Sequence, residues 1–454
     1  MKKLLLILII PFCGHILTAQ NTDWSSPQGG GEFNAQPEHV CLSKENRDLI
    51  KENIQTNIEG LGITINKSTS TTPNFEWPLA VSDQLDFFDY NGITNFLDHD
   101  NTPNILDYNC EDRSYNGHKG TDFVLWPFPW YLYENEFVEV VAAQAGVIIE
   151  KFDGQFDSNC TWVGNNSTWN AVYLMHDDGY ITWYGHLKEN ILTSKSIGET
   201  VEQGEFLGYV ASSGFSDIPH LHFEVYDDEG VLVDPFSGSC STSESLWSNQ
   251  RTYRKPTVNA LLTHSNAPEL GCPVPNEIPH FSNQFNPGEV IYLAAYFQDQ
   301  MANEAYNYSI ISPDGLVVSN WSHSSTETFN LSYWYWTWTP NDNAPLGIWT
   351  FQIERNGLIR EHQFNYGDVQ TSIDNEIDND IKIYPNPVTN NISISGDLLN
   401  VDEITIFNNL GKKLFQTKDI SPEINVASFP NGIYFVRLKS TKNIESINKI
   451  IIQN

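Results

Sequence analysis

The feature that most constrains the fold is a two-residue alternation of apolar and polar side chains. It recurs in runs such as 290–297, 347–353 and 433–438, and the runs are separated by Asn, Gly and Pro. Successive side chains of a strand point to opposite faces of a sheet, so this alternation indicates strands with one buried face. We therefore predict a mainly β chain, with an immunoglobulin-like β-sandwich over residues 255–368 and a small β-sandwich over 381–454.

A row of aromatic residues, 333–338, lies within the first predicted sandwich. On a strand, Trp334, Trp336 and Trp338 share one face. An exposed row of Trp would stack on sugar rings, but Trp at this spacing more often fills a sandwich core. We expect a core position and keep a glycan platform as the alternative.

Composition narrows the class of partner. The chain has 454 residues, enough for about three domains, with 57 acidic and 24 basic side chains and a formal charge of −33. Nucleic-acid affinity needs clustered Lys and Arg, so we expect no nucleic-acid partner.

The N-terminus has the pattern of a secretory signal. Lys2 and Lys3 precede an apolar run over 4–10 and a small-residue exit near Ala19, so we expect a signal peptide at 1–19. Cys13 suggests lipoprotein processing as an alternative, which the bulky residues before it fit poorly. No other segment reaches the ~20 apolar residues of a membrane helix, and we expect no transmembrane segment.

The other end of the chain changes composition after an acidic stretch, which we interpret as a solvated linker over 369–380. Beyond it, the phrases at 384–387, 430–438 and 449–452 resemble the C-terminal sorting domain of type-IX secretion in Bacteroidetes. The resemblance implies export across an outer membrane by the type-IX machinery, with the protein secreted or at the cell surface. The alternative is an ordinary C-terminal β-sandwich with no role in secretion.

Residues 20–72 are polar, with one helical stretch. Ser43 is placed to cap a helix whose apolar residues recur at helical spacing through Ile50, Ile54 and Ile58, before a break at 60–62. The sequence leaves open whether this segment is a propeptide or an arm packed on the next domain.

Five cysteines follow the signal, without any C-x-x-C pair, and exported chains favour disulfides. We expect bonds between Cys110 and Cys160 and between Cys240 and Cys272, with Cys41 left over.

Histidines gather in the region 73–245. His220 and His222 are two residues apart in a strand-like segment, so both rings leave one face. His118 and Asp122 are four apart and meet at one ion only if the chain bends, which we attribute to Gly120. Each pattern alone is weak. Together, two His and one Asp make a three-ligand zinc set with the fourth position open, as in catalytic zinc sites.

These patterns resemble the lysostaphin/LytM-type zinc metallopeptidases, whose signature is H-x-x-x-D followed by H-x-H. The likeness runs from Gly117 to about Pro235. It implies a mainly antiparallel β-sheet domain with a groove between loops. It also implies zinc on His118, Asp122 and His222, with His186 and His220 as the catalytic pair, of which we take His220 as the base.

The sequence therefore predicts a secreted zinc endopeptidase that cuts peptidoglycan cross-links or Gly-rich proteins. The alternative is a surface adhesin that binds cell walls or glycans with the same fold.

The sequence leaves the position of some further side chains open. Tyr184 is placed either to enter the groove or to pack. For Glu224 we prefer a surface position over contact with a zinc ligand, and we do not expect the acidic residues 86–112 to form a regular calcium loop. No G-x-S-x-G motif supports a serine hydrolase.

Overall fold

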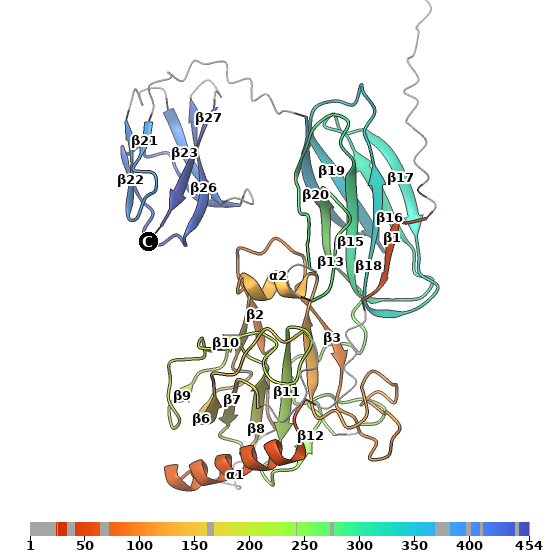
Figure 1. Ribbon diagram of the computed structural model, residues 1–454, viewed down its shortest axis with the longest axis vertical. Helices are drawn as coiled ribbons and strands as arrows, with labels where there is room; N and C mark the ends of the chain where they lie inside the picture. Colours follow the sequence, from red (N-terminus) through yellow and green to blue (C-terminus); the bar gives the residue numbers. More distant parts are fainter. Residues whose placement is uncertain are drawn as a thin grey trace, which may run out of the picture. The chain divides into compact units, whose positions relative to one another are not determined.

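The protein is mainly β, as predicted (Figure 1). The computed structural model describes residues 24, 26–33, 41–63, 72–160, 168–241, 243–272, 277–367, 382–395, 401–408, 412–440 and 445–453. The expected signal peptide and acidic linker lie outside these residues and stay predictions. Within the described residues, no helix is long and apolar enough to cross a membrane.

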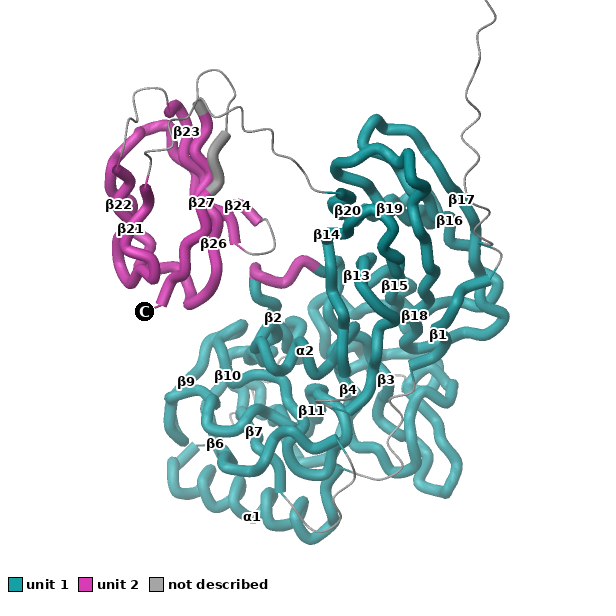
Figure 2. Tube along the Cα trace, turned by 45° about the horizontal axis from the view of Figure 1, so that its top comes forward, with its two compact units in different colours: residues 1–82, 87–367 teal, residues 83–86, 368–454 magenta. Residues whose placement is uncertain are grey.

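The chain divides into two compact units, coloured separately in Figure 2. The first comprises residues 1–82 and 87–367, and the second comprises 83–86 and 368–454.

The first unit contains a large antiparallel sheet of eight strands. In spatial order its strands are β3 (Asn91–Asn95), β4 (Thr121–Leu125), β11 (His220–Tyr226), β8 (Ile181–Gly185), β7 (Ala171–Met175), β6 (Gly146–Phe152) and β9 (Thr200–Val201), with β12 (Leu232–Val233) paired to β11. A smaller sheet joins β10 (Phe206–Tyr209), β5 (Val138–Val141) and β2 (Leu79–Val81), and a short helix, α2 (Pro129–Glu134), follows β4.

The helix predicted in the N-terminal segment is present as α1 (Lys44–Leu61). The Ser43 hydroxyl accepts a hydrogen bond from the Asn46 backbone N–H at 3.2 Å. Gly62 ends the helix in the left-handed region, at φ 65°, which favours glycine. Ile50 and Ile54 are buried in one apolar cluster with Tyr173, Trp183 and other residues of the large sheet. Helix α1 therefore packs on a face of that sheet, alongside β6 (Figure 1).

A sandwich of two sheets completes the first unit. One sheet is β1 (Gly29–Glu32), β18 (Phe329–Trp338), β15 (Ile291–Gln300) and β13 (Thr257–His264); the other is β14 (Gln284–Phe285), β20 (Leu358–Tyr366), β19 (Gly347–Arg355), β16 (Tyr306–Ile311) and β17 (Val317–His323). Trp336 and Trp338 lie in its core, and Trp334 packs against that core. The core position expected for the Trp row is thus confirmed, and the row offers no exposed platform for sugars.

Strand β1 was not predicted, because its sequence is three glycines and a glutamate and has no apolar alternation. It pairs antiparallel with β18. A Cβ on Gly30 would lie 2.1 Å from the Tyr333 carbonyl oxygen. Only glycine permits so close an approach of two backbones, which is why this edge strand lacks the usual strand composition.

The second unit is the small β-sandwich expected at the C-terminus. One sheet is β21 (Lys382–Tyr384), β22 (Asn391–Ser395) and β25 (Glu423–Asn425); the other is β24 (Lys413–Thr417), β23 (Val401–Asn408), β26 (Gly432–Ser440) and β27 (Glu445–Ile452). Alternate residues such as Ile392, Ile406 and Val436 fill the core between them.

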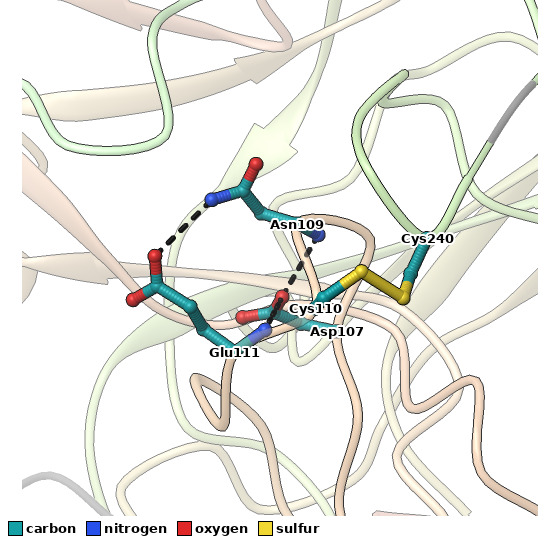
Figure 3. The surroundings of a disulfide bond; sticks show 5 residues. All are labelled: Asp107, Asn109, Cys110, Glu111 and Cys240. Carbon is teal, nitrogen blue, oxygen red and sulfur yellow. Dashed lines mark hydrogen bonds between the residues drawn. A yellow bond between two sulfur atoms is a disulfide. The ribbon is translucent and has the colours of Figure 1, made fainter.

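The expected disulfide pairing was wrong. Cys110 is bonded to Cys240, and Cys160 and Cys272 are free. The Asp107 carboxylate accepts the backbone N–H groups of Asn109 and Glu111, both at 2.9 Å, and so shapes the turn that carries Cys110 (Figure 3). The Cys240 N–H donates to the Tyr108 carbonyl at 2.8 Å. These backbone contacts bring the two cysteines together, and cysteine spacing carries no trace of them.

We expect the Cys110→Ser/Cys240→Ser double variant to be less stable than the wild type by about 2–5 kcal/mol, because the bond closes a loop with a sequence separation of 130. Urea unfolding followed by Trp fluorescence measures this difference. Cys160→Ser/Cys272→Ser is the control, since neither of its thiols is bonded. Equal unfolding midpoints for the two double variants would contradict the prediction.

Candidate metal centre

The site lies on one face of β11. His220, His222 and Glu224 alternate with residues that pack behind the strand, as the sequence pattern predicts. In the ladder, His222 faces Asp122 of β4 on one side and Gly185 of β8 on the other. The central strands of the large sheet thus bring together three segments that are distant in sequence.

His118, Asp122 and His222 point their donor atoms at one another. Nε2 of His118 lies 3.3 Å from Nδ1 of His222 and 3.1 Å from Oδ2 of Asp122. Nδ1 of His222 lies 2.8 Å from Oδ1 of Asp122. Ligands of one tetrahedral zinc ion, at ~2.0–2.3 Å from the metal, lie roughly 3.3–3.6 Å apart. The three donors therefore fit one divalent ion with little adjustment.

The outer ring nitrogens of both histidines are held by acceptors. Nδ1 of His118 donates to the Phe96 carbonyl at 2.7 Å, and Nε2 of His222 lies 2.9 Å from a Glu224 carboxylate oxygen. Each contact places a ring proton on the outer nitrogen, so the nitrogen that faces the cluster is the one that would bind a metal ion. Outer contacts of this kind orient metal-binding histidines in proteins.

Glu224 is not a surface residue, so the preference stated for it was wrong: only 1% of it is exposed. Arg47 of α1 donates to both of its carboxylate oxygens, at 2.5 and 2.8 Å, and the Tyr226 hydroxyl donates at 2.7 Å. Burial alone would raise the pKa of Glu224, but the charge of Arg47 and the hydrogen bonds from His222 and Arg47 hold it well below its usual range. The carboxylate is therefore ionised beside His222.

Asn95 was missed by the sequence reasoning. Its side-chain amide donates to Oδ2 of Asp122 at 3.0 Å from β3, the neighbouring strand. No short motif marks it, because its relation to Asp122 arises only from the pairing of β3 with β4. Burial opposes ionisation of Asp122, but the charges of His118 and His220 lower its pKa well below the usual value.

His186 and His220 stand beside the three donors, with ring centroids 4.4 Å apart. Nδ1 of His186 donates to the Ser213 carbonyl at 2.6 Å, and Nδ1 of His220 donates to the Ile218 carbonyl at 2.8 Å. A carbonyl only accepts, so the neutral form of each ring carries its proton on Nδ1 and a lone pair on Nε2. Each ring can take up one proton on Nε2 and later release it.

The surroundings shift the pKa values of His186 and His220 in opposite directions. Burial, followed by the charge of His220, lowers the pKa of His186. Burial would also lower the pKa of His220, but the Asp122 carboxylate, the Cys41 sulfur and the hydrogen bond to the Ile218 carbonyl together raise that pKa. Nε2 of His186 is buried and has no hydrogen-bond partner within the described part of the chain. His186 also has φ 64°, a left-handed conformation that costs a non-glycine residue ~1–3 kcal/mol and is common at functional sites.

Gly120 has a different role from the bend assigned to it. Its φ lies outside the left-handed region, whereas a Cβ at this position would lie 2.5 Å from the Phe223 carbonyl oxygen and 2.8 Å from Nε2 of His222. The glycine provides room for the His222 ring. The left-handed residue in this turn is Gly117, with φ 79°.

Tyr184 packs rather than entering the site. It pairs with Phe223 on the opposite face of the sheet, and its hydroxyl accepts the Ala143 N–H at 2.9 Å. In the acidic loop, the carboxylates of Asp98 and Asp107 accept backbone N–H groups. Among the described residues, no potential metal-binding group includes this loop.

Cys41 also lies at the site, which the sequence did not predict. This residue, two positions before the Ser43 cap of α1, lies against the histidines, and its sulfur is 3.8 Å from Nδ1 of His222. Cys41, His186, His220 and His222 form a second group of potential ligands, whose donor atoms lie within 4.8 Å of one another. The sequence marked Cys41 only as the odd thiol.

Comparison with known proteins assigns two parts of the chain to families. Residues 117–235 match peptidase family M23, and residues 382–453 match the secretion system C-terminal sorting domain. Both resemblances drawn from the sequence are confirmed. The sorting domain indicates export through type-IX secretion to the cell surface or the medium.

Relatives of the first region include the peptidoglycan DD-endopeptidase ShyC of Vibrio cholerae, 32% identical over 129 residues, which cover 28% of this chain and 24% of the relative. The glycyl-glycine endopeptidase ALE-1 of Staphylococcus capitis is 32% identical over 101 residues, 20% of this chain and 27% of the relative. The chain thus matches about a quarter of the length of each of these relatives. Among solved structures, the catalytic domain of lysostaphin from Staphylococcus simulans aligns with 21% identity and a TM-score of 0.20, covering 32% of this chain and 85% of that one.

Proposed function

We propose that this chain, which carries a domain of peptidase family M23 and a secretion sorting domain, is a secreted zinc endopeptidase. One observation carries the proposal. Three buried donors, on His118, Asp122 and His222, face a common point, and two imidazoles beside them have their outer nitrogens fixed by backbone carbonyls.

His118, Asp122 and His222 would hold the ion. With two neutral imidazoles and one carboxylate as ligands, a bound Zn²⁺ would keep a net charge of +1 and would supply Lewis-acid chemistry, polarising a scissile carbonyl and lowering the pKa of water towards ~7. Glu224 and the Phe96 carbonyl orient the two ligand rings, and Asn95 orients the carboxylate.

His220 and His186 act as the general base and the general acid. His220 accepts the proton of the attacking water on Nε2, because this nitrogen lies 3.6 Å from a carboxylate oxygen of Asp122, which favours the protonated ring. His186, once protonated on Nε2, donates either to the developing oxyanion or to the leaving amine. Their Nδ1 contacts keep both lone pairs directed into the site throughout.

The substrate class follows from the named relatives and from the chemistry of the chain. The relatives are named for peptidoglycan and for glycyl-glycine bonds. Glycine lets a substrate backbone approach a buried centre closely. We therefore place the cleaved bond in peptidoglycan cross-links or in Gly-rich proteins. The adhesin alternative loses its main support, because the Trp row lies in or against the sandwich core.

The test is hydrolysis by zinc-loaded wild type and by the Cys41→Ala variant, with and without chelator. Peptidoglycan and an elastin-like protein are the two substrates, and new amino groups are counted. The proposal predicts that at least the Cys41→Ala variant releases new amino groups and that chelator abolishes this release. The variant is included because the Cys41 sulfur lies against the histidines of the site. If both proteins hold zinc and bind walls but release no amino groups, the adhesin is favoured and the peptidase proposal fails.

Glu224→Gln is expected to weaken zinc binding about 10- to 100-fold, because a neutral amide orients and polarises His222 less well than a carboxylate. Competition with a metal-sensitive dye measures the affinity. Glu229→Gln is the matched control, since Glu229 is an exposed residue of the turn after β11. Equal affinities of the two variants would contradict the role given to Glu224.

A further inference from the structure

We propose that Cys41 is a fourth zinc ligand and that residues 41–63 keep the enzyme latent by occupying the position that the attacking water requires. The inference rests on the zinc endopeptidase function proposed above. It concerns how that site is regulated and which residue completes it.

The placement of the Cys41 sulfur is the first support. Only 5% of the residue is exposed, so this thiol is not available to a partner in solution. Its sulfur lies 3.8 Å from Nδ1 of His222 and 3.2 Å from the Tyr115 hydroxyl. Nδ1 of His222 is the atom that also faces His118 and Asp122, so the sulfur lies next to one of the three proposed ligands, on the side of the site that carries His186 and His220.

Ligand geometry is the second support. A thiolate at ~2.3 Å and an imidazole nitrogen at ~2.0–2.1 Å from one tetrahedral zinc ion lie roughly 3.5 Å apart. The 3.8 Å separation between Cys41 and His222 is close to this value. Catalytic zinc sites keep the fourth position for water, whereas structural sites fill it. When the thiol binds, its proton passes to solvent and the sulfur closes the site.

A buried ring nitrogen of His186 without a hydrogen-bond partner is the third observation. Nε2 of His186 is fully buried and has no hydrogen-bond partner within the described ranges. A ring nitrogen of His186 lies within 4.8 Å of the Cys41 sulfur. A buried imidazole lone pair without a donor is costly. Water or substrate in the position of the sulfur would supply that donor.

Helix α1 holds Cys41 in place. The Ser43 cap, two residues after Cys41, fixes the start of the helix. One turn on, Arg47 forms its two hydrogen bonds to the buried Glu224. Ile50 and Ile54 then pack into the apolar cluster on the large sheet. The same carboxylate therefore orients a proposed zinc ligand and anchors the segment that blocks the site.

The segment also covers the approach to the site. His118, Asp122, His186, His220 and His222 are all buried, none more than 6% exposed. Trp183, which packs with Ile50, faces Glu224 across the ladder between β8 and β11. Helix α1 thus lies on the face of the sheet that carries the histidines. Residues 41–63 therefore narrow the approach of a polymeric substrate to these side chains.

The test compares full-length wild type, Cys41→Ser, Cys41→Ala and the control Cys160→Ala, each loaded with Co²⁺ in place of zinc. A thiolate bound to Co²⁺ gives an intense near-ultraviolet charge-transfer band. We expect this band in wild type and in Cys160→Ala and its loss in both Cys41 variants. With zinc, we expect Cys41→Ala to release amino groups from peptidoglycan about 100-fold faster than wild type.

The two proposals fail in different ways. No sulfur band in wild type, or an unchanged band in the Cys41 variants, overturns Cys41 as a ligand. Equal chelator-sensitive rates in wild type and Cys41→Ala overturn latency and leave the peptidase function standing. A band that depends on Cys41, with no hydrolysis by any variant, overturns the peptidase function while the ligand assignment stands.

Discussion

His222→Ala is expected to lose both zinc and hydrolysis, whereas His186→Ala is expected to keep zinc and lose about 10²- to 10⁴-fold in rate. The reason is the different position of the two rings. Nδ1 of His222 lies within 3.3 Å of donors on both His118 and Asp122, while His186 has its Nδ1 committed to the Ser213 carbonyl. Metal analysis and amino-group release, both in the Cys41→Ala background, separate binding from chemistry.

The control for this pair is His280→Ala, a histidine of the sandwich that contacts Glu269 and lies outside the candidate centre. It should retain zinc and full activity. A His186→Ala protein that no longer binds zinc would contradict the division of roles. A fully active His222→Ala protein would contradict the ligand set itself.

Ile50→Asp is expected to activate the full-length enzyme at least 10-fold without any change to Cys41. Ile50 is fully buried against the large sheet. Its replacement removes about 2–5 kcal/mol of apolar contact and puts an unpaired charge there. Helix α1 should detach, and Cys41 should become accessible. The measurements are the rate of amino-group release and the rate at which Cys41 is alkylated, read by mass spectrometry.

Leu49→Asp is the matched control, because Leu49 is adjacent in α1 but 47% exposed. Leu49→Asp adds the same charge to the exposed side of the same helix. The rate of amino-group release and the rate of Cys41 alkylation should therefore stay at wild-type values. Equal behaviour of the two variants would show that α1 does not control access to the site.

Local patterns predicted much of the fold. The alternation in β11 placed His220 and His222 on one face, and the cap and spacing around Ser43 and Ile50 indicated α1. These features follow from the period of a strand or a helix, which a short stretch of sequence contains in full. Strand β1 lacked such a pattern, because its glycines serve close backbone approach.

The contacts that complete the site were beyond the sequence. Cys41 and His222 are separated by 181 positions, and Arg47 and Glu224 by 177. Pairing of this kind depends on how α1 packs on the large sheet, and neither residue type nor spacing records it. The same limit explains the wrong disulfide pairing, which depends on backbone contacts between Tyr108 and Cys240.

The central claim is that one zinc ion is bound by His118, Asp122 and His222 and is closed by Cys41. A crystal structure of zinc-loaded full-length protein, with anomalous scattering recorded at the zinc edge, tests it most directly. The account predicts one peak within bonding distance of those three side chains and of the Cys41 sulfur. A peak bound by Cys41, His186, His220 and His222 without Asp122 and His118, or no peak at all, would contradict it.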